Sequence, residues 1–205
     1  MAVFTKLNRS KIENFLNNYD IGELDSFEEI IEGIENSNFK IVCNKKKYIL
    51  TIFEKRVNNE DLPFFINLKF YLYENNFLCP KPIKDINGNV INKIEDKNAV
   101  IISFLDGKQI VDPSIDKCNE IGRIIGNLHN LTVNFKEFRK NSLGFSEWKN
   151  LYKKCMDSDS KKFHFILNEL ELELNFIQNN WPKNLPSGII HADLFKDNVF
   201  FKGNK

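Results

Sequence analysis

The stretch that decides the predicted fold is Ile189-Ile190-His191-Ala192-Asp193-Leu194-Phe195-Lys196-Asp197-Asn198-Val199-Phe200-Phe201. It places a short polar segment between two apolar runs, and such runs are typical of strands. Within the polar segment, His191, Asp193 and Asn198 follow the spacing H-x-D-x-x-x-x-N. We therefore expect a strand, then a loop that carries these three side chains, then a second strand.

The spacing of these residues is typical of the catalytic loop of eukaryotic-like kinases. An Asp at this place accepts the proton of a hydroxyl acceptor, so Asp193 is the candidate general base. Asn198 can ligate Mg²⁺ through its amide oxygen, and His191 is expected to hold the loop in shape by hydrogen bonding. Phe195 departs from the protein-kinase form, in which a phosphate-contacting Lys is common there. The alternative is an ordinary polar turn, with Asp193 and Asn198 as turn residues.

The composition is that of a globular protein without an obvious charged partner. The chain has 205 residues, of which 42% are hydrophobic and 28% charged, with a net charge of +1. Nothing in this balance indicates a nucleic-acid or anionic-membrane surface. No apolar run approaches the length of a membrane span, and residues 1–11 contain no apolar signal core. We therefore expect a cytoplasmic protein with no nucleic-acid and no membrane partner.

Cysteine and histidine usage gives no sign of a transition-metal site. Cys43, Cys79, Cys118 and Cys155 are far apart and form no C-x-x-C pair. They are predicted to be reduced and mostly buried thiols. The sequence has only three histidines, which makes a His-rich metal site improbable.

Strands and one long helix are predicted for the first half of the chain. A short helix is expected over residues 9–16, and Asn87-Gly88 is a strong signal for a two-residue hairpin. Asp61 is a candidate helix cap, and Pro63 is tolerated in a first helical turn. The predicted strands span residues 22–27, 38–43, 47–53 and 99–105, and the long helix spans residues 60–75.

Helices dominate the second half. Apolar residues recur with helical periodicity over residues 115–131, 148–155 and 163–181. A strand-rich half followed by a helical half predicts an α+β, bilobal, protein kinase-like fold. Its N-terminal lobe, an antiparallel sheet with one helix, would span residues 1–105. A hinge near residues 103–113 would lead to a helical lobe over residues 106–205 that carries the loop 191–198, with nucleotide in the cleft at the hinge.

Several stretches along the chain belong together with the loop 191–198. They are Ala2-Val3-Phe4-Thr5, Gly33-Ile34-Glu35-Asn36-Ser37-Asn38-Phe39, Tyr48-Ile49-Leu50-Thr51-Ile52-Phe53-Glu54 and Asp61-Leu62-Pro63-Phe64-Phe65-Ile66. With these stretches the chain closely resembles bacterial homoserine kinases of the aminoglycoside phosphotransferase-like type, whose wider relatives are choline kinases and methylthioribose kinase. The resemblance covers essentially all of the chain, and E-N-S-N-F and D-L-P-F-F favour the homoserine kinase branch.

The resemblance implies phosphoryl transfer from ATP and Mg²⁺ to the side-chain hydroxyl of L-homoserine, in threonine biosynthesis. Asp193 would orient and deprotonate that hydroxyl, and Asn198 would hold one Mg²⁺. The turn over residues 33–38 would cover the phosphates, although the loop taken alone favours an ordinary hairpin turn. The hinge would take the adenine edge through backbone groups. The implied nucleotide-binding residues are Gly33, Asn36, Ser37, Asn38, Thr51, Ser103 and Leu105.

One position in the third strand departs from the pattern of the superfamily. Most members carry a Lys there that pairs with the nucleotide phosphates, and the matching residue here is Thr51. Its hydroxyl can donate one hydrogen bond but carries no charge. Either Lys47, Lys55 or Arg56 substitutes, or this branch does without such a cation, and solvated surface is the simpler expectation for each of the three.

The superfamily also requires a second Asp shortly after the strand that follows the catalytic loop. The sequence ends at Lys205, four residues after Phe201, before such an Asp occurs. We therefore expect an incomplete helical lobe and slow or undetectable transfer, unless a carboxylate such as Asp197 completes the metal site. Two alternatives remain open: a kinase for another small hydroxylated substrate, such as choline or an aminoglycoside, and a non-catalytic remnant.

Overall fold

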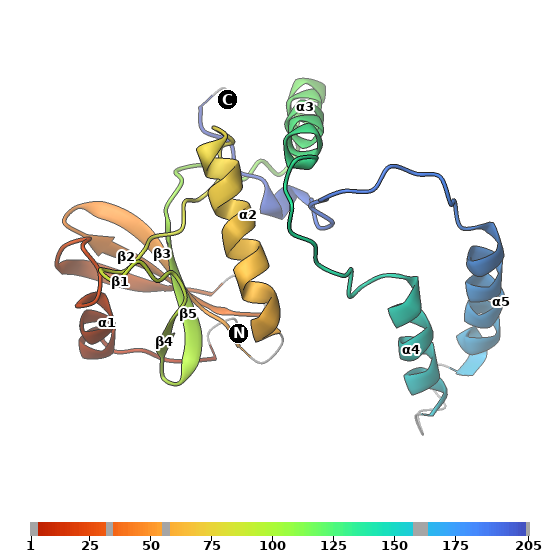
Figure 1. Cartoon of the computed structure of the whole chain (residues 1–205), viewed down its shortest axis with the longest axis horizontal. Coiled ribbons are helices and arrows are strands. Elements are labelled where there is room, and N and C mark those ends of the chain that lie inside the picture. The colour runs from red at the N-terminus through yellow and green to blue at the C-terminus, as the bar shows by residue number, and fades with distance from the viewer. Residues whose placement is uncertain (1–3, 32–34, 55–57, 158–163, 204–205) are drawn as a thin grey trace. The chain divides into compact units, whose positions relative to one another are not determined.

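The computed structural model describes residues 4–31, 35–54, 58–157 and 164–203 (Figure 1). The chain divides into two compact units. The first consists of Met1–Glu137 with Gly188–Lys205, and the second is Phe138–Ser187. The loop with His191, Asp193 and Asn198 thus belongs to the same unit as the sheet. This division does not coincide with the predicted lobe boundary at residues 105 and 106.

The first unit is built on a five-stranded antiparallel sheet with the strand order β1-β2-β3-β5-β4 (Figure 1). Side chains alternate between the two faces of each strand, and in β2 every second residue is buried. The sheet confirms the predicted α+β class with an antiparallel N-terminal sheet. The strands are β1 (Leu24–Ile30), β2 (Ser37–Cys43), β3 (Lys46–Ile52), β4 (Asn92–Ile94) and β5 (Lys97–Ser103).

Helix α1 (Arg9–Leu16) covers one face of the sheet and closes the main hydrophobic core. Asn8 caps the helix, because its side chain accepts a hydrogen bond of 3.0 Å from the Lys11 N–H. The apolar stripe of α1 then packs against the buried face of β2, β3 and β5. The central members of this core are Ile12, Phe15, Leu16, Phe39, Ile41, Leu50, Ile52 and Ile101.

Helix α2 (Leu62–Glu74) follows the short 3₁₀ turn η1 (Asn59–Asp61), so the predicted helix is confirmed. Asp61 stands at the N-cap position, but its side chain makes no capping hydrogen bond. The ring of Tyr71 lies 5.2 Å from that of Phe135, and the Tyr71 hydroxyl donates to the Leu131 carbonyl at 3.0 Å. These contacts hold α2 against the segment around Leu131 and Phe135, which follows the sheet in the sequence.

The hairpin predicted at Asn87-Gly88 does not form, although a turn does. The carboxylate of Asp85 accepts hydrogen bonds from the N–H groups of Asn87 and Asn89, at 2.9 and 2.7 Å. An Asp side chain that binds the following backbone in this way competes with strand pairing. Strand β4 accordingly begins only at Asn92.

Tight hairpins occur instead at two turns without glycine. The φ angles are 45° and 64° at Asn44 and Lys45, between β2 and β3. They are 51° and 61° at Glu95 and Asp96, between β4 and β5. Two-residue loops with both φ values positive are type I′ turns, which follow the right-handed twist of the strands. Neither turn contains the usual Asn-Gly or Asp-Gly pair, so the sequence did not predict these two hairpins.

Replacing Lys45 by Gly is expected to stabilise the first unit by about 0.5–1 kcal/mol. The change removes the strain of a side chain at φ 64° and creates Asn-Gly, the preferred type I′ pair. The Lys45 N–H keeps its 2.7 Å hydrogen bond to Asp25 Oδ2. Chemical denaturation would measure the change. Lys46→Gly, one residue later in the strand, should lower stability instead, and a gain in both variants would contradict the assignment.

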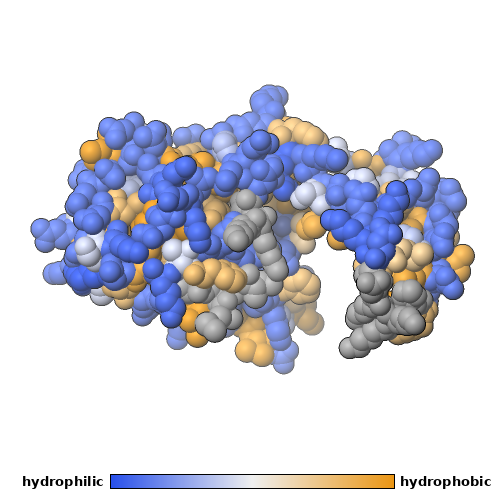
Figure 2. All heavy atoms as spheres, turned by 90° about the horizontal axis from the view of Figure 1, so that it is seen from below, coloured by the Kyte–Doolittle hydropathy of each residue, from blue (hydrophilic) through white to orange (hydrophobic). Residues whose placement is uncertain are grey.

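The three helices predicted for the second half are confirmed. They are α3 (Ile115–Thr132), α4 (Phe145–Met156) and α5 (His164–Asn180). In the second unit, the rings of Phe145 and Trp148 on α4 lie 6.4 and 6.1 Å from that of Trp181, just after α5. Several large apolar side chains on α3 and α5 are exposed, including those of Ile115, Phe165 and Phe176. Apolar residues also interrupt the polar surface on the face shown in Figure 2.

Within the described ranges, no helix is long and apolar enough to cross a membrane.

The four cysteines are free thiols, but their expected burial is only partly correct. Cys43 is buried in the core and Cys79 is half-buried, whereas Cys118 and Cys155 are exposed. The exposed pair lies on α3 and α4, whose surfaces are largely solvent-accessible. Burial, together with the nearby charge of Asp25, raises the pKa of Cys43 to about 11.

Alkylation should distinguish these thiols. At pH 8 we expect iodoacetamide to modify Cys118 and Cys155 at least tenfold faster than Cys43, since the thiolate is the reactive form. Peptide mass spectrometry over time would measure the three rates in the native protein. In denaturant all of them should react at similar rates, and a native Cys43 as reactive as Cys118 would contradict its burial.

Candidate active site

The loop with the H-x-D-x-x-x-x-N spacing is held by one turn and one bridge rather than by two strands. A 3₁₀ turn, η3 (Lys196–Asn198), forms its second half. The described residues on either side form no strand, and the only pairing there is an isolated antiparallel bridge between Phe201 and Lys108. The prediction of flanking strands was therefore wrong. Apolar runs become strands only where a neighbouring segment pairs with them, and here a single residue does so.

The structure brings Asp193 and Asn198 together. The side-chain Nδ2 of Asn198 donates to the carbonyl oxygen of Asp193 at 2.8 Å and to its carboxylate Oδ2 at 3.0 Å. These two bonds fix the carboxylate relative to the amide across the loop. Since Nδ2 faces Asp193, the Oδ1 atom of Asn198 is the one that remains for a cation.

The backbone between His191 and Asp193 adopts a left-handed conformation. Ala192 has a φ of 64°, a conformation that costs a residue with a Cβ about 1–2 kcal/mol. Backbone strain of this kind concentrates at functional sites. His191 is exposed, and among the described residues its side chain has no hydrogen-bond partner. Its predicted role in shaping the loop therefore stays a prediction.

The oxygen atoms at this loop are of the type that Mg²⁺ prefers. Asp193 supplies a carboxylate and Asn198 an amide oxygen, and both are exposed. Magnesium commonly binds through one or two protein oxygens and completes its octahedral shell with phosphates and water. In the described residues no group of three His, Cys, Asp or Glu side chains could hold a metal ion. The two oxygens of Asp193 and Asn198 are therefore of a kind that could hold Mg²⁺ together with oxygen atoms from outside the chain.

The predicted phosphate-covering turn is described only from Glu35 onward. Gly33 lies outside the described residues. Asn36 is half-buried, and its Oδ1 accepts a hydrogen bond from the Glu54 N–H at 3.4 Å. The Ser37 side chain is fully buried, and its Oγ accepts the N–H groups of Phe4 and Thr5 at 2.9 and 3.0 Å. To donate to a phosphate, the Ser37 hydroxyl would have to give up the hydrogen bond of 2.7 Å that it donates to Oε1 of Glu54, so the structure favours a positioning role for this hydroxyl.

A buried polar cluster that the sequence did not indicate lies at the base of this turn. Ser37 Oγ and Thr5 Oγ1 both donate to Oε1 of Glu54, each at 2.7 Å. Lys97 on β5 forms an ion pair with Oε2 of Glu54 and donates to Thr5 Oγ1 at 2.6 Å. The Glu54 side chain is 8% exposed. Desolvation alone would raise the pKa of Glu54, but the hydrogen bonds from Lys97, Thr5 and Ser37 bring it below its usual value.

Thr51 and Asn38 form a cross-strand pair. They are partners in the β2–β3 register, and Thr51 Oγ1 donates to Asn38 Oδ1 at 2.8 Å. Lys47 is at the opposite end of β3, where its ammonium lies 3.0 Å from the Asp106 carboxylate. Lys47 therefore pairs with Asp106 at the end of β3 that lies away from Thr51. The two other candidate cations, Lys55 and Arg56, lie outside the described residues.

Hydrogen bonds within the protein limit which backbone N–H groups of the predicted hinge are available to a ligand. The Ser103 N–H donates to the Lys81 carbonyl at 2.8 Å, and its Oγ accepts the Lys81 N–H at 2.9 Å. The Phe104 N–H donates to the Lys47 carbonyl at 3.3 Å. Ser103 and Phe104 are therefore occupied, and the N–H of Leu105 is the next backbone donor. Leu105 is exposed, so it can meet a ligand.

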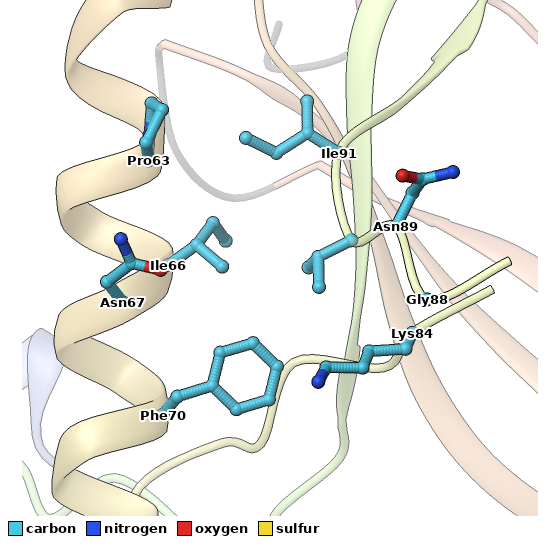
Figure 3. Close-up of a pocket in the computed structure, with 9 residues that line it drawn as sticks. Pro63, Ile66, Asn67, Phe70, Lys84, Gly88, Asn89 and Ile91 are labelled. Atoms are coloured by element: carbon cyan, nitrogen blue, oxygen red, sulfur yellow. The ribbon is translucent and has the colours of Figure 1, made fainter.

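A shallow hollow of about 400 Å³ lies elsewhere in the first unit (Figure 3). Ile66 and Phe70 of α2 face Ile91 and the aliphatic part of Lys84 across it. None of the predicted site residues lines this hollow. It is a gap between α2 and the segment that precedes β4, and it adds nothing to the candidate active site.

Comparison with known proteins identifies the family of this chain. A model of the "Phosphotransferase enzyme family" matches residues 26–205. Homoserine kinase from Bartonella tribocorum is 43% identical over 201 residues, which make up 98% of this chain and 63% of that protein. Homoserine kinase from Rhizobium meliloti is 40% identical over 205 residues, or 100% of this chain and 63% of that protein.

A solved structure shares the fold at much lower sequence identity. It is a spectinomycin phosphotransferase in complex with ADP and spectinomycin, with a TM-score of 0.70 and 12% identity. The match covers 98% of this chain and 67% of that chain. These findings confirm the predicted resemblance and the predicted fold class.

The present chain spans about 63% of the length of the homoserine kinases that it matches. The family model nevertheless covers most of it, including the whole sheet after the first residues of β1 and the loop with Asp193 and Asn198. The chain belongs to the phosphotransferase enzyme family.

Proposed function

We propose that the protein serves in phosphoryl transfer from ATP to the side-chain hydroxyl of L-homoserine. The observation that carries the proposal is the Asp193–Asn198 pair, joined by two hydrogen bonds from the Asn198 amide. The two residues stand where the kinase loop places its base and a metal ligand. Similarity to homoserine kinases over essentially the whole chain supports homoserine as the acceptor.

Asp193 would orient the acceptor hydroxyl and take its proton. Its carboxylate is exposed, so a hydroxyl can approach to the 2.6–3.2 Å or so that proton transfer requires. Oδ2 is held by Asn198 at 3.0 Å, which leaves Oδ1 as the atom that faces the substrate. Fixing the carboxylate before the substrate arrives lowers the reorganisation needed in the transition state.

The remaining groups would bind the nucleotide. Asn198 Oδ1 would hold Mg²⁺, which supplies neutralisation of the phosphate charge when it is bound. The phosphates would be faced by backbone N–H groups near Asn36 and by the Thr51–Asn38 pair. Ser37 would hold this turn in place through its hydrogen bond to Glu54. The Leu105 N–H would donate to the adenine edge.

The test is an ADP-release assay with homoserine, choline and an aminoglycoside as alternative acceptors. Two proteins would be assayed side by side. One is the 205-residue chain, and the other is a chimera in which these residues replace the matching segment of the Rhizobium meliloti homoserine kinase. We expect homoserine-dependent ADP release in the chimera, with choline and the aminoglycoside at least 100-fold less efficient.

The chimera that carries Asp193→Asn is the matched control and should lose the homoserine-dependent rate. A preference for choline or the aminoglycoside would reassign the acceptor. A folded chimera that binds ATP but transfers phosphate to none of the three would refute the proposal.

A further inference from the structure

We propose that the segment Gly107–Val111 positions the catalytic loop, and that Gln109 is the positioning residue for the Asp193–Asn198 pair. The significance for catalysis rests on the proposed function, whereas the contacts themselves do not. The side chain of Gln109 donates through Nε2 to the carbonyl oxygen of Asp197 at 2.6 Å. Asp197 lies inside η3, directly before Asn198.

Backbone pairing holds the far end of the loop to the same segment. Lys108 and Phe201 exchange two hydrogen bonds, each N–H donating to the partner's carbonyl at 2.9 Å. The ammonium of Lys117 on α3 lies 4.6 Å from the centre of the Phe201 ring. Phe201 is also buried, so packing and backbone hydrogen bonds together hold this end of the loop in place.

Two further contacts join the segment to the loop between these ends. Lys196 donates through Nζ to the Val111 carbonyl at 3.1 Å. At Gly107, an added Cβ would lie 2.9 Å from the Cβ of Phe200, closer than such atoms normally approach. The absence of a side chain at Gly107 therefore lets the segment lie directly against the loop.

A series of hydrogen bonds connects Gln109 to the candidate base, Asp193. Gln109 holds the Asp197 carbonyl, which sets the orientation of η3. The turn presents the Asn198 amide, and that amide holds the Asp193 carboxylate through Nδ2. η3 is a single exposed turn without a side-chain cap, and the contact from Gln109 sets its orientation together with the bond from Lys196 to the Val111 carbonyl. A catalytic group displaced by about 1 Å can lose on the order of 100-fold in rate, so this contact matters for catalysis.

The decisive variant is Gln109→Glu, which keeps the size of the side chain but removes the donor. NMR of the 205-residue chain should show the Asn198 side-chain amide protons moving toward the shifts of a free amide. Amide hydrogen exchange at Asn198 and Phe201 should accelerate at least tenfold. The sheet amides of β2 and β3 should keep their exchange rates, which separates loss of positioning from general destabilisation.

Gln178→Ala, in the second compact unit, is the matched control and should change none of these signals. Gly107→Ala is a second variant that pushes on Phe200 and should change them in the same direction as Gln109→Glu. An unchanged Asn198 amide and unchanged exchange in both Gln109→Glu and Gly107→Ala would overturn the proposal.

The kinetic arm separates this proposal from the proposed function. In the homoserine assay, Gln109→Glu should lower kcat about tenfold or more while the KM for ATP changes less than twofold. A normal kcat in a variant with a displaced Asn198 amide would overturn the catalytic role of the positioning. If the unsubstituted chimera binds ATP but transfers no phosphate to homoserine, the proposed function fails, and the NMR and exchange measurements on the 205-residue chain still decide whether Gln109 holds the loop.

Discussion

Replacing Asp193 by Ala is expected to lower kcat for homoserine phosphorylation by about 10²–10⁴-fold, while the KM for ATP changes by less than about threefold. In the proposed mechanism Asp193 acts on the acceptor hydroxyl and not on the nucleotide, so ATP binding should be largely retained. Its carboxylate is also oriented before the substrate binds, through the 3.0 Å hydrogen bond from Asn198. Steady-state kinetics in the homoserine assay would measure both constants in the chimera described above.

Asp197→Ala is the matched control for this variant. Asp197 is also an exposed carboxylate in the same loop, but the contact that the structure gives it is made by its backbone carbonyl. Its side chain should therefore be dispensable, with kcat within about threefold of the original. Comparable losses in the two variants would show that Asp197 belongs to the metal site, and full turnover in Asp193→Ala would refute its role as the base.

Most of the secondary structure could be predicted because the apolar periodicities are strong and agree with the burial in the folded protein. The stripe of Ile12, Phe15 and Leu16 in α1 is buried, and so is the alternating face of β2. The prediction failed where local hydrogen bonds or strain decide the structure. Asp85 binds its own turn instead of allowing a hairpin, and Lys45 adopts a positive φ that its side chain does not favour.

The candidate site was predictable in part, because its motif residues are close in sequence. Asp193 and Asn198 are five positions apart, and a loop of that length brings them together. Contacts between distant segments left no local pattern. Gln109 reaches Asp197 across 88 positions, and Thr5 reaches Glu54 across 49. The hydrogen bonds of Ser37 to Phe4, Thr5 and Glu54 also join distant parts of the sequence. The sequence pattern therefore did not show them, and Ser37 was predicted to contact the phosphates.

Glu54→Ala is expected to lower the free energy of unfolding by about 2–4 kcal/mol. Glu54 is the common acceptor of Thr5, Ser37 and Lys97, and its side chain is 8% exposed. Removing it leaves two buried hydroxyls and an ammonium without their shared acceptor. Lys97 is 37% exposed and can regain water, so the loss should stay below that of a fully buried ion pair.

Glu28→Ala provides the control for this variant. Glu28 also pairs with a lysine, Lys40, within the same sheet, but its side chain is 63% exposed. An exposed pair contributes at most about 1 kcal/mol, so its removal should have a small effect. Urea denaturation followed by circular dichroism would measure both variants. A loss at Glu54 no larger than that at Glu28 would contradict the structural importance of the buried cluster.

The pH dependence of stability gives a sharper test of the same cluster. The hydrogen bonds from Lys97, Thr5 and Ser37 lower the pKa of Glu54 in the folded protein. The stability from its ionised form is therefore fully present above the pKa of unfolded Glu, about 4.3, and is lost as the pH falls through the lower folded pKa. Glu54→Gln cannot ionise, so the difference in unfolding free energy between it and the original protein should be constant from pH 7 to about pH 5 and shrink below that. A difference that stays constant down to about pH 3 would show that the charge of Glu54 is not what stabilises the turn over residues 36–38.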